Sequence, residues 1–438
     1  MLESGFVLFL QTTNANEFIS LPYLFMVLFS IYLFSVWLAR NRSPHNREAL
    51  LVVLIFAVAF RLTLLFSGPV FSLDVFRYPW DGKVAASGMN PYVYRPNATE
   101  LTALRDANWE LVNHKELRTG YPPLMEMLFE TLYLTFPSVM SYKIVFFLFD
   151  LATIATACFI LKELKLDLTN AVVYAWAPLP IVEISQTGHN VSVAVFFVLL
   201  SFLLLLRNRN YSSASVMALA VATELYPVFF APILLKRWGK WGTSIFLALI
   251  LGFHIPYADV GLNIYSGLLY AINTSNFNGS VFPLIMNLVG VTDLTSNPGL
   301  TAEIAVYISY VLLLLWALWK SLSERIPPVE LMKLTFLLTG AVLLLNRSLF
   351  AWYLIWIIPF LCFYSSVSWL LLSGTTFLSY IKYDTLPPPP FEGVTPLTAL
   401  AIDLVQYMPF YVILAYELFK HRIRLRPHGV QASTRKMK

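Results

Sequence analysis

Cysteine is almost absent from this chain. Only Cys158 and Cys362 occur in 438 residues, and both lie within apolar runs. A disulfide framework or a thiolate metal centre needs more cysteines, more closely spaced, than these two positions supply. We therefore expect both to be small apolar core residues, as free cysteines usually are in protein interiors.

Charge is scarce as well. Lys, Arg, Asp and Glu make up 13% of the chain, against roughly 25% in soluble domains, while hydrophobic residues make up 58%. The first residues lack a basic cluster, which argues against a cleaved signal peptide. The sequence contains no internal repeat, and its one low-complexity segment is LPPPP at 386–390. This composition excludes an ordinary soluble enzyme and predicts an all-α polytopic membrane protein.

Long apolar runs are abundant. Runs of about 17–25 residues can cross a bilayer as helices. They predict about eleven transmembrane helices, with a range of about ten to thirteen. The runs lie near residues 19–39, 49–67, 142–161, 170–187, 190–206, 243–259, 302–320, 329–346, 348–364, 366–381 and 397–418.

Basic residues mark the connectors on one side. They follow the first run, recur at 162–165, 207–209, 236–240 and 320–325, and fill the tail at 420–438. The positive-inside rule places these connectors in the cytoplasm. The N-terminus and residues 68–141 are then outside, and the C-terminus is inside. A basic tail also suits nucleic acid, but in a polytopic protein we expect a cytoplasmic anchor and no nucleic-acid partner.

Two apolar segments do not fit this topology as full spans. Residues 121–136 begin with YPPL and contain Glu126 and Glu130, so we expect an interfacial helix started by its prolines. Residues 212–235 have basic flanks and are interrupted by Glu224 and Pro227. They predict a re-entrant hairpin or a pair of half-helices lined by protein.

The segment FSLDVFRYPWDGKVAASGMNPY at 71–92 is rich in polar chemistry. It places Asp74 and Asp81 beside Arg77 and Lys83, among several aromatic side chains. A helix that only had to sit in lipid would need none of these charges. The cluster therefore favours a functional site at a membrane–water boundary.

Ionisable residues also sort by side in this topology. The short cytoplasmic loops are mostly basic, whereas the outer set carries both signs. Chemistry facing away from the cytoplasm excludes direct use of cytosolic nucleotide-activated sugars and favours a membrane-borne donor. The outer set is Asp74, Arg77, Asp81, Lys83, Arg95, Arg105, Asp106, Glu110, His114, Lys115, Glu116, Arg118 and Glu126, with Glu183, His189 and Arg347 near outer helix ends.

The pattern Asp74-x-x-Arg77-Tyr78-x-Trp80-Asp81-Gly82, followed by Gly88-x-Asn90-Pro91-Tyr92, resembles the first outer loop of GT-C glycosyltransferases. It is most similar to bacterial mannosyltransferase-type members that use polyprenyl-phosphate sugars. The resemblance covers about residues 50–365 and is looser after the first loop. Further matching motifs are Leu104-Arg105-Asp106, Trp109, Asn113-His114, Tyr121-Pro122-Pro123-Leu124, Gly188-His189-Asn190, Leu225-Tyr226-Pro227, Phe277-Asn278-Gly279-Ser280 and Trp352-Tyr353 with Trp356 and Pro359.

The resemblance implies inverting transfer of a hexose, with mannose favoured, from a polyprenyl-phosphate donor to a hydroxyl of a glycolipid or glycan. It implies Asp74 as general base, a role worth roughly 10²–10⁴-fold in rate. The leaving phosphate needs cations opposite it, and Arg77, Arg105, Arg347 and His114 are the candidates. Other expected substrate contacts are Tyr78, Trp80, Asp81, Asn90, Tyr92, Tyr121, His189, Asn278 and Trp352. No cofactor or metal is implied.

The resemblance also divides the chain. Residues 1–48 would be an added transmembrane helix with a basic connector, and 49–365 the catalytic membrane core. Residues 366–419 would be C-terminal helices, and 420–438 a cytoplasmic tail. The expected location is a prokaryotic plasma membrane, with membrane lipids as further partners.

Each assignment has a structural alternative. Asp74 and Arg77 are three apart and could form an i,i+3 ion pair, and Asp81 could orient Arg77 or Lys83. A metal site at Asp74 and Asp81 stays open, although further ligands are few. The aromatic residues could belong to an interfacial belt, His114 could be solvated surface, and Arg347 a snorkelling anchor.

The chain departs from the family pattern at two positions. Asn190, Val191 and Ser192 follow His189 where the family often has an acid, and Glu224 stands where it often has Lys before Tyr-Pro. Two other classes therefore stay open. Intramembrane Glu183 and Glu224 would suit a transporter or lipid flippase, and the departures would suit a non-catalytic subunit of a glycan-assembly complex.

Overall fold

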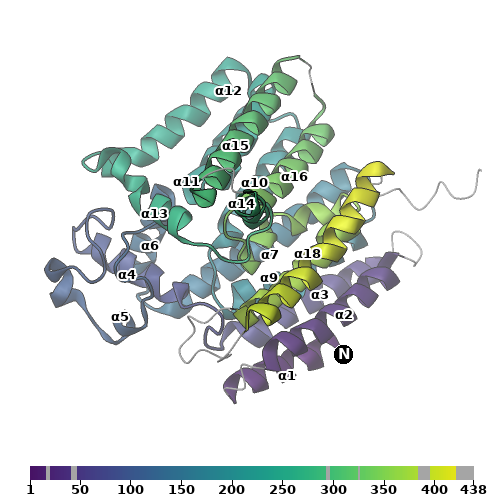
Figure 1. Ribbon diagram of the computed structural model, residues 1–438, viewed down its shortest axis with the longest axis horizontal. Helices are drawn as coiled ribbons and strands as arrows, with labels where there is room; N and C mark the ends of the chain where they lie inside the picture. Colours follow the sequence, from purple (N-terminus) through teal and green to yellow (C-terminus); the bar gives the residue numbers. More distant parts are fainter. Residues whose placement is uncertain (16–19, 41–46, 293–295, 324–325, 383–394, 421–438) are drawn as a thin grey trace, which may run out of the picture. The chain divides into compact units, whose positions relative to one another are not determined.

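The computed structural model describes residues 1–15, 20–40, 47–292, 296–323, 326–382 and 395–420. The LPPPP segment and the tail after residue 420 lie outside these ranges. The described residues form helices and loops without a β-strand (Figure 1). The predicted all-α class is therefore confirmed.

Six helices in the described ranges are long and apolar enough to span a membrane, which confirms a polytopic membrane protein. Each matches one of the predicted runs. Residues Tyr226–Tyr257 and Gly261–Thr274 form a bent pair, at 94°, that would count as a seventh. The six are α2 (Leu21–Arg40), α3 (Arg47–Leu65), α7 (Val139–Glu163), α15 (Pro298–Ser323), α16 (Pro328–Leu345) and α18 (Pro396–Phe419).

Uninterrupted spans are fewer than the predicted eleven because several apolar runs are broken. Proline at 178, 180 and 359 removes a backbone donor and disfavours a continuous helix. The run at 190–206 is the short α10 (Val191–Leu206), and the run at 243–259 is the end of α12 (Ala231–His254). The broken runs contain 3-10 turns at Leu168–Ala171, Ala351–Trp356, Ile358–Cys362 and Thr376–Lys382, a π-helix at Ile181–Gln186, and the short α8 (Val172–Ala175), α9 (Pro178–Pro180) and α17 (Val367–Thr375).

Two irregular segments have the predicted secondary structure. Helix α6 (Pro123–Thr135) is short and begins at its prolines. Helix α11 (Asn210–Thr223) ends where Glu224 adopts an extended backbone, and a 3-10 turn leads from there into α12. A helix that we did not predict, α1 (Leu2–Asn14), precedes α2.

The chain forms two compact units. Unit 1 comprises Met1–Ser72, Lys143–Ser192 and Leu354–Lys438, and unit 2 comprises Leu73–Tyr142 and Val193–Tyr353. In unit 1, α1 packs against α2 and α3, and α17 packs against α18. In unit 2, α6 packs against α4 (Arg77–Ala86), α12 against α11, and α15 against α14 (Val281–Val291). The functional boundaries expected from the sequence stay a prediction.

A buried ion pair supports the broken segment of unit 1. Arg61 on α3 donates from Nε to Asp150 Oδ2 on α7 at 2.6 Å, and neither side chain is exposed. Arg61 Nη1 also donates to the carbonyl oxygen of Ala175 at 2.7 Å, where α8 ends. Tyr174 donates its hydroxyl to Asp150 Oδ1. Side chains thus provide polar partners beside a helix break, which water could not do within a bilayer.

A second acidic group of unit 1 caps a helix. Glu417 on α18 accepts hydrogen bonds from the hydroxyls of Ser366 and Ser368 and from the backbone N–H of Val367. These groups lie at the N-terminus of α17, where helix donors lack partners and negative charge is favourable. Glu417 therefore ties the end of α18 to the start of α17.

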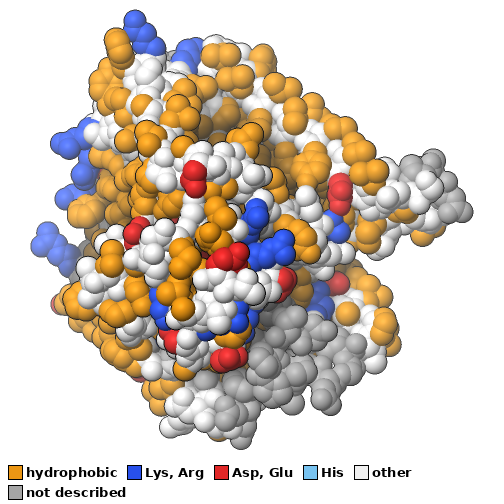
Figure 2. Space-filling view, turned by 90° about the vertical axis from the view of Figure 1, so that its left-hand side faces the viewer, with side chains coloured by type: hydrophobic (Ala, Val, Ile, Leu, Met, Phe, Trp, Pro, Cys, Tyr) orange, Lys and Arg blue, Asp and Glu red, His pale blue; other side chains and the backbone are white. Residues whose placement is uncertain are grey.

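Exposed apolar surface is extensive. On α15, Val311, Leu315 and Trp319 are each more than half exposed. Hydrophobic side chains cover much of the face shown in Figure 2. Such surface exceeds what a soluble monomer displays and is expected where helices contact lipid.

Candidate active site

The polar residues at 71–92 are positioned by a tight turn and a helix of unit 2. A 3-10 turn at Asp74–Phe76 leads directly into α4. Gly82 lets α4 approach α6 closely, because a Cβ at that position would lie 2.3 Å from the carbonyl oxygen of Phe129. The close approach brings the first turns of α4 beside the buried face of α6.

Arg77 and Asp81 form a buried ion pair one turn apart on α4. Arg77 Nε lies 2.8 Å from both carboxylate oxygens of Asp81. Arg77 also donates to the carbonyl oxygens of Leu117, at 3.1 Å, and His114, at 3.5 Å. Burial opposes the charge on Arg77, but the Asp81 carboxylate outweighs it and raises the pKa of the guanidinium. Arg77 is therefore a fixed cation that holds the loop.

Glu126 on α6 adds a second carboxyl group to this cluster. It is fully buried, and Oε1 accepts a hydrogen bond from the Thr119 hydroxyl at 2.5 Å. Burial and then the Asp81 carboxylate raise the pKa of Glu126 well above its usual range. Burial also raises the pKa of Asp81, although Arg77 opposes that rise. Arg77 is the cation beside these two carboxyl groups, and it pairs with Asp81. Glu126 is therefore the group that keeps its proton.

Asp74 lies in a different environment from Asp81 and Glu126. Its side chain is half-buried, and Oδ1 accepts a hydrogen bond from Asn113 Nδ2 at 2.5 Å. Arg77, the i,i+3 partner in the structural alternative, directs its guanidinium to Asp81. A carboxylate that is oriented by an amide and still reaches solvent can accept a proton from a bound hydroxyl.

The aromatic residues of the motif are mostly interior. Tyr78, Trp80 and Tyr92 are between 0% and 3% exposed, so they pack inside unit 2. Tyr78 stacks on Phe129 with ring centroids 4.9 Å apart. Trp80 belongs to a cluster with Val84, Leu101 and Val112. This interior packing differs both from sugar stacking and from the interfacial belt that was the structural alternative.

Tyr92 and Tyr121 connect neighbouring turns. The Tyr92 hydroxyl donates to the carbonyl oxygen of Tyr121 at 2.6 Å. Burial, followed by the charges of Tyr78 and Asp74, raises the pKa of Tyr121 well above its usual value, so its hydroxyl stays protonated. Asn90 accepts a hydrogen bond from the backbone N–H of Tyr92 and donates to Asp259.

Two of the predicted phosphate ligands have local partners. Arg105 donates to the carbonyl oxygens of Asn97 and Ala98 and lies 4.5 Å from the ring centre of Trp109. His114 is 57% exposed at its side chain, with Nδ1 3.6 Å from the Glu116 carboxylate. The carbonyl of His114, and not its ring, reaches Arg77.

Arg347, Asn278 and Trp352 lie together in another part of unit 2. Arg347 donates to Glu303 on α15 at 2.5 Å and covers the Phe282 ring at 4.9 Å. Asn278, with a positive φ, donates to the carbonyl oxygen of Leu349, and Trp352 stacks on Phe350. An anion at Arg347 would therefore have to share the guanidinium with Glu303.

His189 belongs to unit 1. Its Nδ1 lies 3.0 Å from Glu183 Oε2, and the Tyr380 hydroxyl donates to Glu183 Oε1 at 2.6 Å. All three side chains are buried. Glu183 therefore has two hydrogen-bonding partners, His189 and Tyr380, where the family's usual acid after His189 is absent.

Sequence reasoning did not assign roles to Asn113, Thr119, Glu126 or Glu303. Asn113 adjoins His114 in a matching motif, and Glu126 stands out as an acid in an apolar helix, so both carried a signal. Thr119 and Glu303 carried none. Within the described ranges, the structure contains no group of three or more His, Cys, Asp and Glu residues that could hold a metal ion.

Comparisons with known proteins identify the family. No curated protein matches the chain. A family model described as "Alpha-(1->6)-mannopyranosyltransferase, N-terminal domain" matches residues 2–240, which is more than half of the chain. The matched region includes α4, α6 and the loop that carries Asp74. The resemblance to a GT-C-type mannosyltransferase is confirmed. The chain therefore belongs to the alpha-(1->6)-mannopyranosyltransferase family and is a membrane glycosyltransferase.

Proposed function

We propose that this protein transfers mannose from a polyprenyl-phosphate donor to an acceptor hydroxyl at the extracytoplasmic face, with Asp74 as general base. The observation that carries the proposal is the Asp74 carboxylate, half-buried and held by Asn113 at 2.5 Å in the matching motif. Mannosyl transfer itself follows from the family. The donor, the base and the side of the membrane are our assignments.

In the proposed reaction, Asp74 takes the proton from the acceptor hydroxyl as that oxygen attacks C1 of the mannose. The new C1–O bond forms as the bond between C1 and the phosphate oxygen breaks, and the electron pair leaves with the lipid phosphate. Inversion at C1 gives an α-linkage only from a β-linked donor. From the α-(1->6) linkage in the family's description, we take a sugar 6-hydroxyl as the acceptor.

The remaining cluster supports this chemistry by holding shape. Arg77, paired with Asp81, donates to the carbonyls of Leu117 and His114 and so fixes the loop segment that also carries Asn113. The positive charge near the start of α4 also favours a nearby anion. These contacts make Arg77 a positioning residue in the proposal.

The test is Asp74→Asn in the purified full-length protein, supplied with radiolabelled polyprenyl-phosphate mannose and a mannoside acceptor. We expect transfer to fall by roughly 10²–10⁴-fold, because a positioned base is lost while the shape is kept. Donor binding should stay close to wild type. Glu110→Gln removes an exposed carboxylate from the same loop and is the matched control, with transfer unchanged.

Two results would contradict the proposal. Turnover near the wild-type rate in Asp74→Asn would remove Asp74 as the base. Uptake of labelled sugar into sealed vesicles without transfer to an acceptor would favour the carrier class instead.

A further inference from the structure

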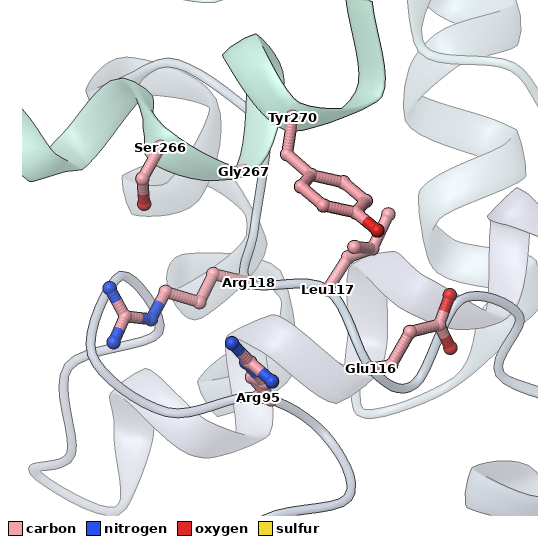
Figure 3. A pocket seen from close by; sticks show the side chains of 7 residues that line it. All are labelled: Arg95, Glu116, Leu117, Arg118, Ser266, Gly267 and Tyr270. Atoms are coloured by element: carbon pink, nitrogen blue, oxygen red, sulfur yellow. The ribbon is translucent and has the colours of Figure 1, made fainter. Parts of the chain in front are cut away.

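A pocket of about 300 Å³ lies in unit 2 between the loop of residues 95–118 and the start of α13 (Ser266–Thr274). It contains none of the residues assigned to the reaction above. Figure 3 shows the side chains around it. The lining residues are Arg95, Glu116, Leu117, Arg118, Ser266, Gly267 and Tyr270.

The pocket presents donors without acceptors. Within the described part of the chain, neither Arg95 nor Arg118 has a hydrogen-bond or ion-pair partner for its guanidinium. Arg118 Nε and Ser266 Oγ are both buried atoms that lack a hydrogen-bond partner. Burying donors without acceptors is costly, and a bound anion would remove that cost. Two guanidiniums and a hydroxyl are the groups that bind phosphate oxygens.

The one acid in the lining does not neutralise the two arginines. Glu116 turns its carboxylate to the opposite side of the pocket from the Arg118 guanidinium (Figure 3). One of its carboxylate oxygens lies 3.6 Å from the Nδ1 of His114, which is outside the pocket lining. The side of the pocket with Arg118 and Ser266 therefore remains positive.

Glycine brings α13 against the loop. A Cβ at Gly267 would lie 2.4 Å from the carbonyl oxygen of Thr119 and 2.5 Å from that of Arg118. Only a residue without a side chain allows this approach. It sets the first turn of a nine-residue helix beside the Arg118 backbone.

The same helix displays apolar side chains outward. Leu269, Tyr270 and Ile272 are between 42% and 54% exposed, and Leu262, in the 3-10 turn just before α13, is 87% exposed. The segment Gly261–Thr274 lies at 94° to the apolar segment before it, as an interfacial helix lies relative to a spanning one. The pocket thus joins an anion site to an apolar surface.

We propose that this pocket binds the phosphate group of a membrane lipid, whose hydrocarbon chain lies along α13. Arg118, Arg95 and Ser266 contact the phosphate, and Tyr270 and Leu269 contact the chain. The ligand is a phosphate ester on a long hydrocarbon chain, a chemistry shared by a polyprenyl phosphate and a glycerophospholipid. Where the lipid is the polyprenyl carrier, the proposal deepens the proposed function.

The pocket is also linked to the candidate active site through one short segment. Leu117 lines the pocket, and its carbonyl accepts from Arg77 at 3.1 Å. Thr119, adjacent to Arg118, donates to Glu126. Occupation of the pocket would therefore restrain the segment that holds the Arg77 cluster.

Binding is measured on the full-length protein in detergent with three probes: a radiolabelled short-chain polyprenyl phosphate, a short-chain phosphatidylglycerol and inorganic phosphate. Arg118→Gln should weaken lipid binding roughly tenfold to a hundredfold, the size of a lost charge-assisted hydrogen bond. Glu116→Gln should tighten it, because a nearby negative charge is removed. Lys115→Gln removes a cation from the same loop outside the pocket and should leave binding unchanged.

The three probes distinguish the source of the phosphate. Tight binding of the polyprenyl phosphate alone identifies the carrier, and tight binding of phosphatidylglycerol identifies a bilayer lipid. If inorganic phosphate binds as tightly as either lipid, the hydrocarbon chain does not contribute to binding, and the proposed contact with α13 is overturned. Tyr270→Ser tests that contact directly. Unchanged lipid binding in both Arg118→Gln and Arg95→Gln overturns the proposal entirely.

The two proposals fail separately. Asp74→Asn should keep lipid-phosphate binding whether or not it transfers mannose, because Asp74 does not line the pocket. Loss of transfer in Asp74→Asn with binding intact supports both proposals. An active Asp74→Asn with intact binding refutes the base and leaves the pocket supported.

Discussion

At the residue scale, three carboxyl groups of segment 68–141 occupy three environments. Asp74 is half-buried and held by an amide, Asp81 is tied to Arg77, and Glu126 is fully buried beside Thr119. One site can contain both a base and a structural acid, because different environments favour different protonation states of its carboxyl groups. Asp74 suits the base, and Glu126 suits a neutral structural group.

The raised pKa of Glu126 predicts a pH dependence of stability. The folded protein holds a proton on Glu126 that the unfolded chain releases above about pH 4.5, its usual pKa. This contribution is complete below pH 4.5 and is lost as pH rises through the folded pKa. The loss has a limiting slope of about 1.4 kcal/mol per pH unit for one proton.

Glu126→Gln should remove this component, because an amide does not titrate in that range. Thermal unfolding of both proteins across pH 4–9 measures the difference. The wild-type melting temperature should fall relative to that of the variant as pH rises. Parallel curves would show that Glu126 is ionised in the folded protein.

At the element scale, the contact between α4 and α6 determines where the loop residues lie. The carbonyl oxygen of Phe129 occupies the space that a Cβ at position 82 would need. The Tyr142 hydroxyl donates to that same carbonyl at 2.8 Å. A rigid backbone group cannot move aside as a flexible side chain can. The position of Asp74 and Arg77 therefore depends on a glycine that takes no part in the reaction.

Gly82→Ala should destabilise the protein by about 1–3 kcal/mol, the usual cost of overpacking. Mannosyl transfer should fall further than stability alone explains, since α4 must shift. Gly252→Ala is the matched control, because it lies in α12 with open space around its Cβ and should be neutral or stabilising. Equal transfer rates in the two variants, at equal folded fraction, would show that the close approach of α4 to α6 does not position the site.

At the scale of the whole molecule, the candidate residues fall mainly in one unit. Of the predicted site residues, only His189 belongs to unit 1, whereas Asp74, Arg105 and Arg347 all belong to unit 2. Unit 1 holds α2, α3 and α18, three of the helices long enough to span a membrane. The family match at residues 2–240 includes parts of both units.

The proposed topology predicts which residues reagents reach from outside the cell. Glu110→Cys should react with a membrane-impermeant maleimide in intact cells, because segment 68–141 is placed outside. The native cysteines are a built-in control, since Cys362 is buried and Cys158 lies half-buried in the apolar helix α7. Labelling of the variant only after permeabilisation would place the segment, and the chemistry, in the cytoplasm.

The sequence predicted the class, the motif loop and the two irregular segments, because apolar runs and prolines act locally. It did not predict the breaks in 170–187, although Pro178 and Pro180 lie there, and it could not reveal that their polar partner, Arg61, comes from a helix more than a hundred residues away. It also missed the pocket at Arg95 and Arg118. Whether a guanidinium has an ion-pair partner depends on the fold. From the sequence alone, Arg95 and Arg118 could equally have formed ion pairs with Glu110 or Glu116.

The pair of Arg61 and Asp150 has a consequence for how the protein is made. The two residues are 89 positions apart, so α3 leaves the ribosome well before α7. A lone charge at the centre of a helix costs about 2.5–3.5 kcal/mol during insertion. Asp150 lies near the middle of α7, whereas Arg61 lies four residues from the end of α3, so this cost falls mainly on α7. The segment around Ala175 gains its Arg61 hydrogen bond only after α3 is present. Insertion of α7 should accordingly depend on α3, which is made first and supplies the cation for Asp150.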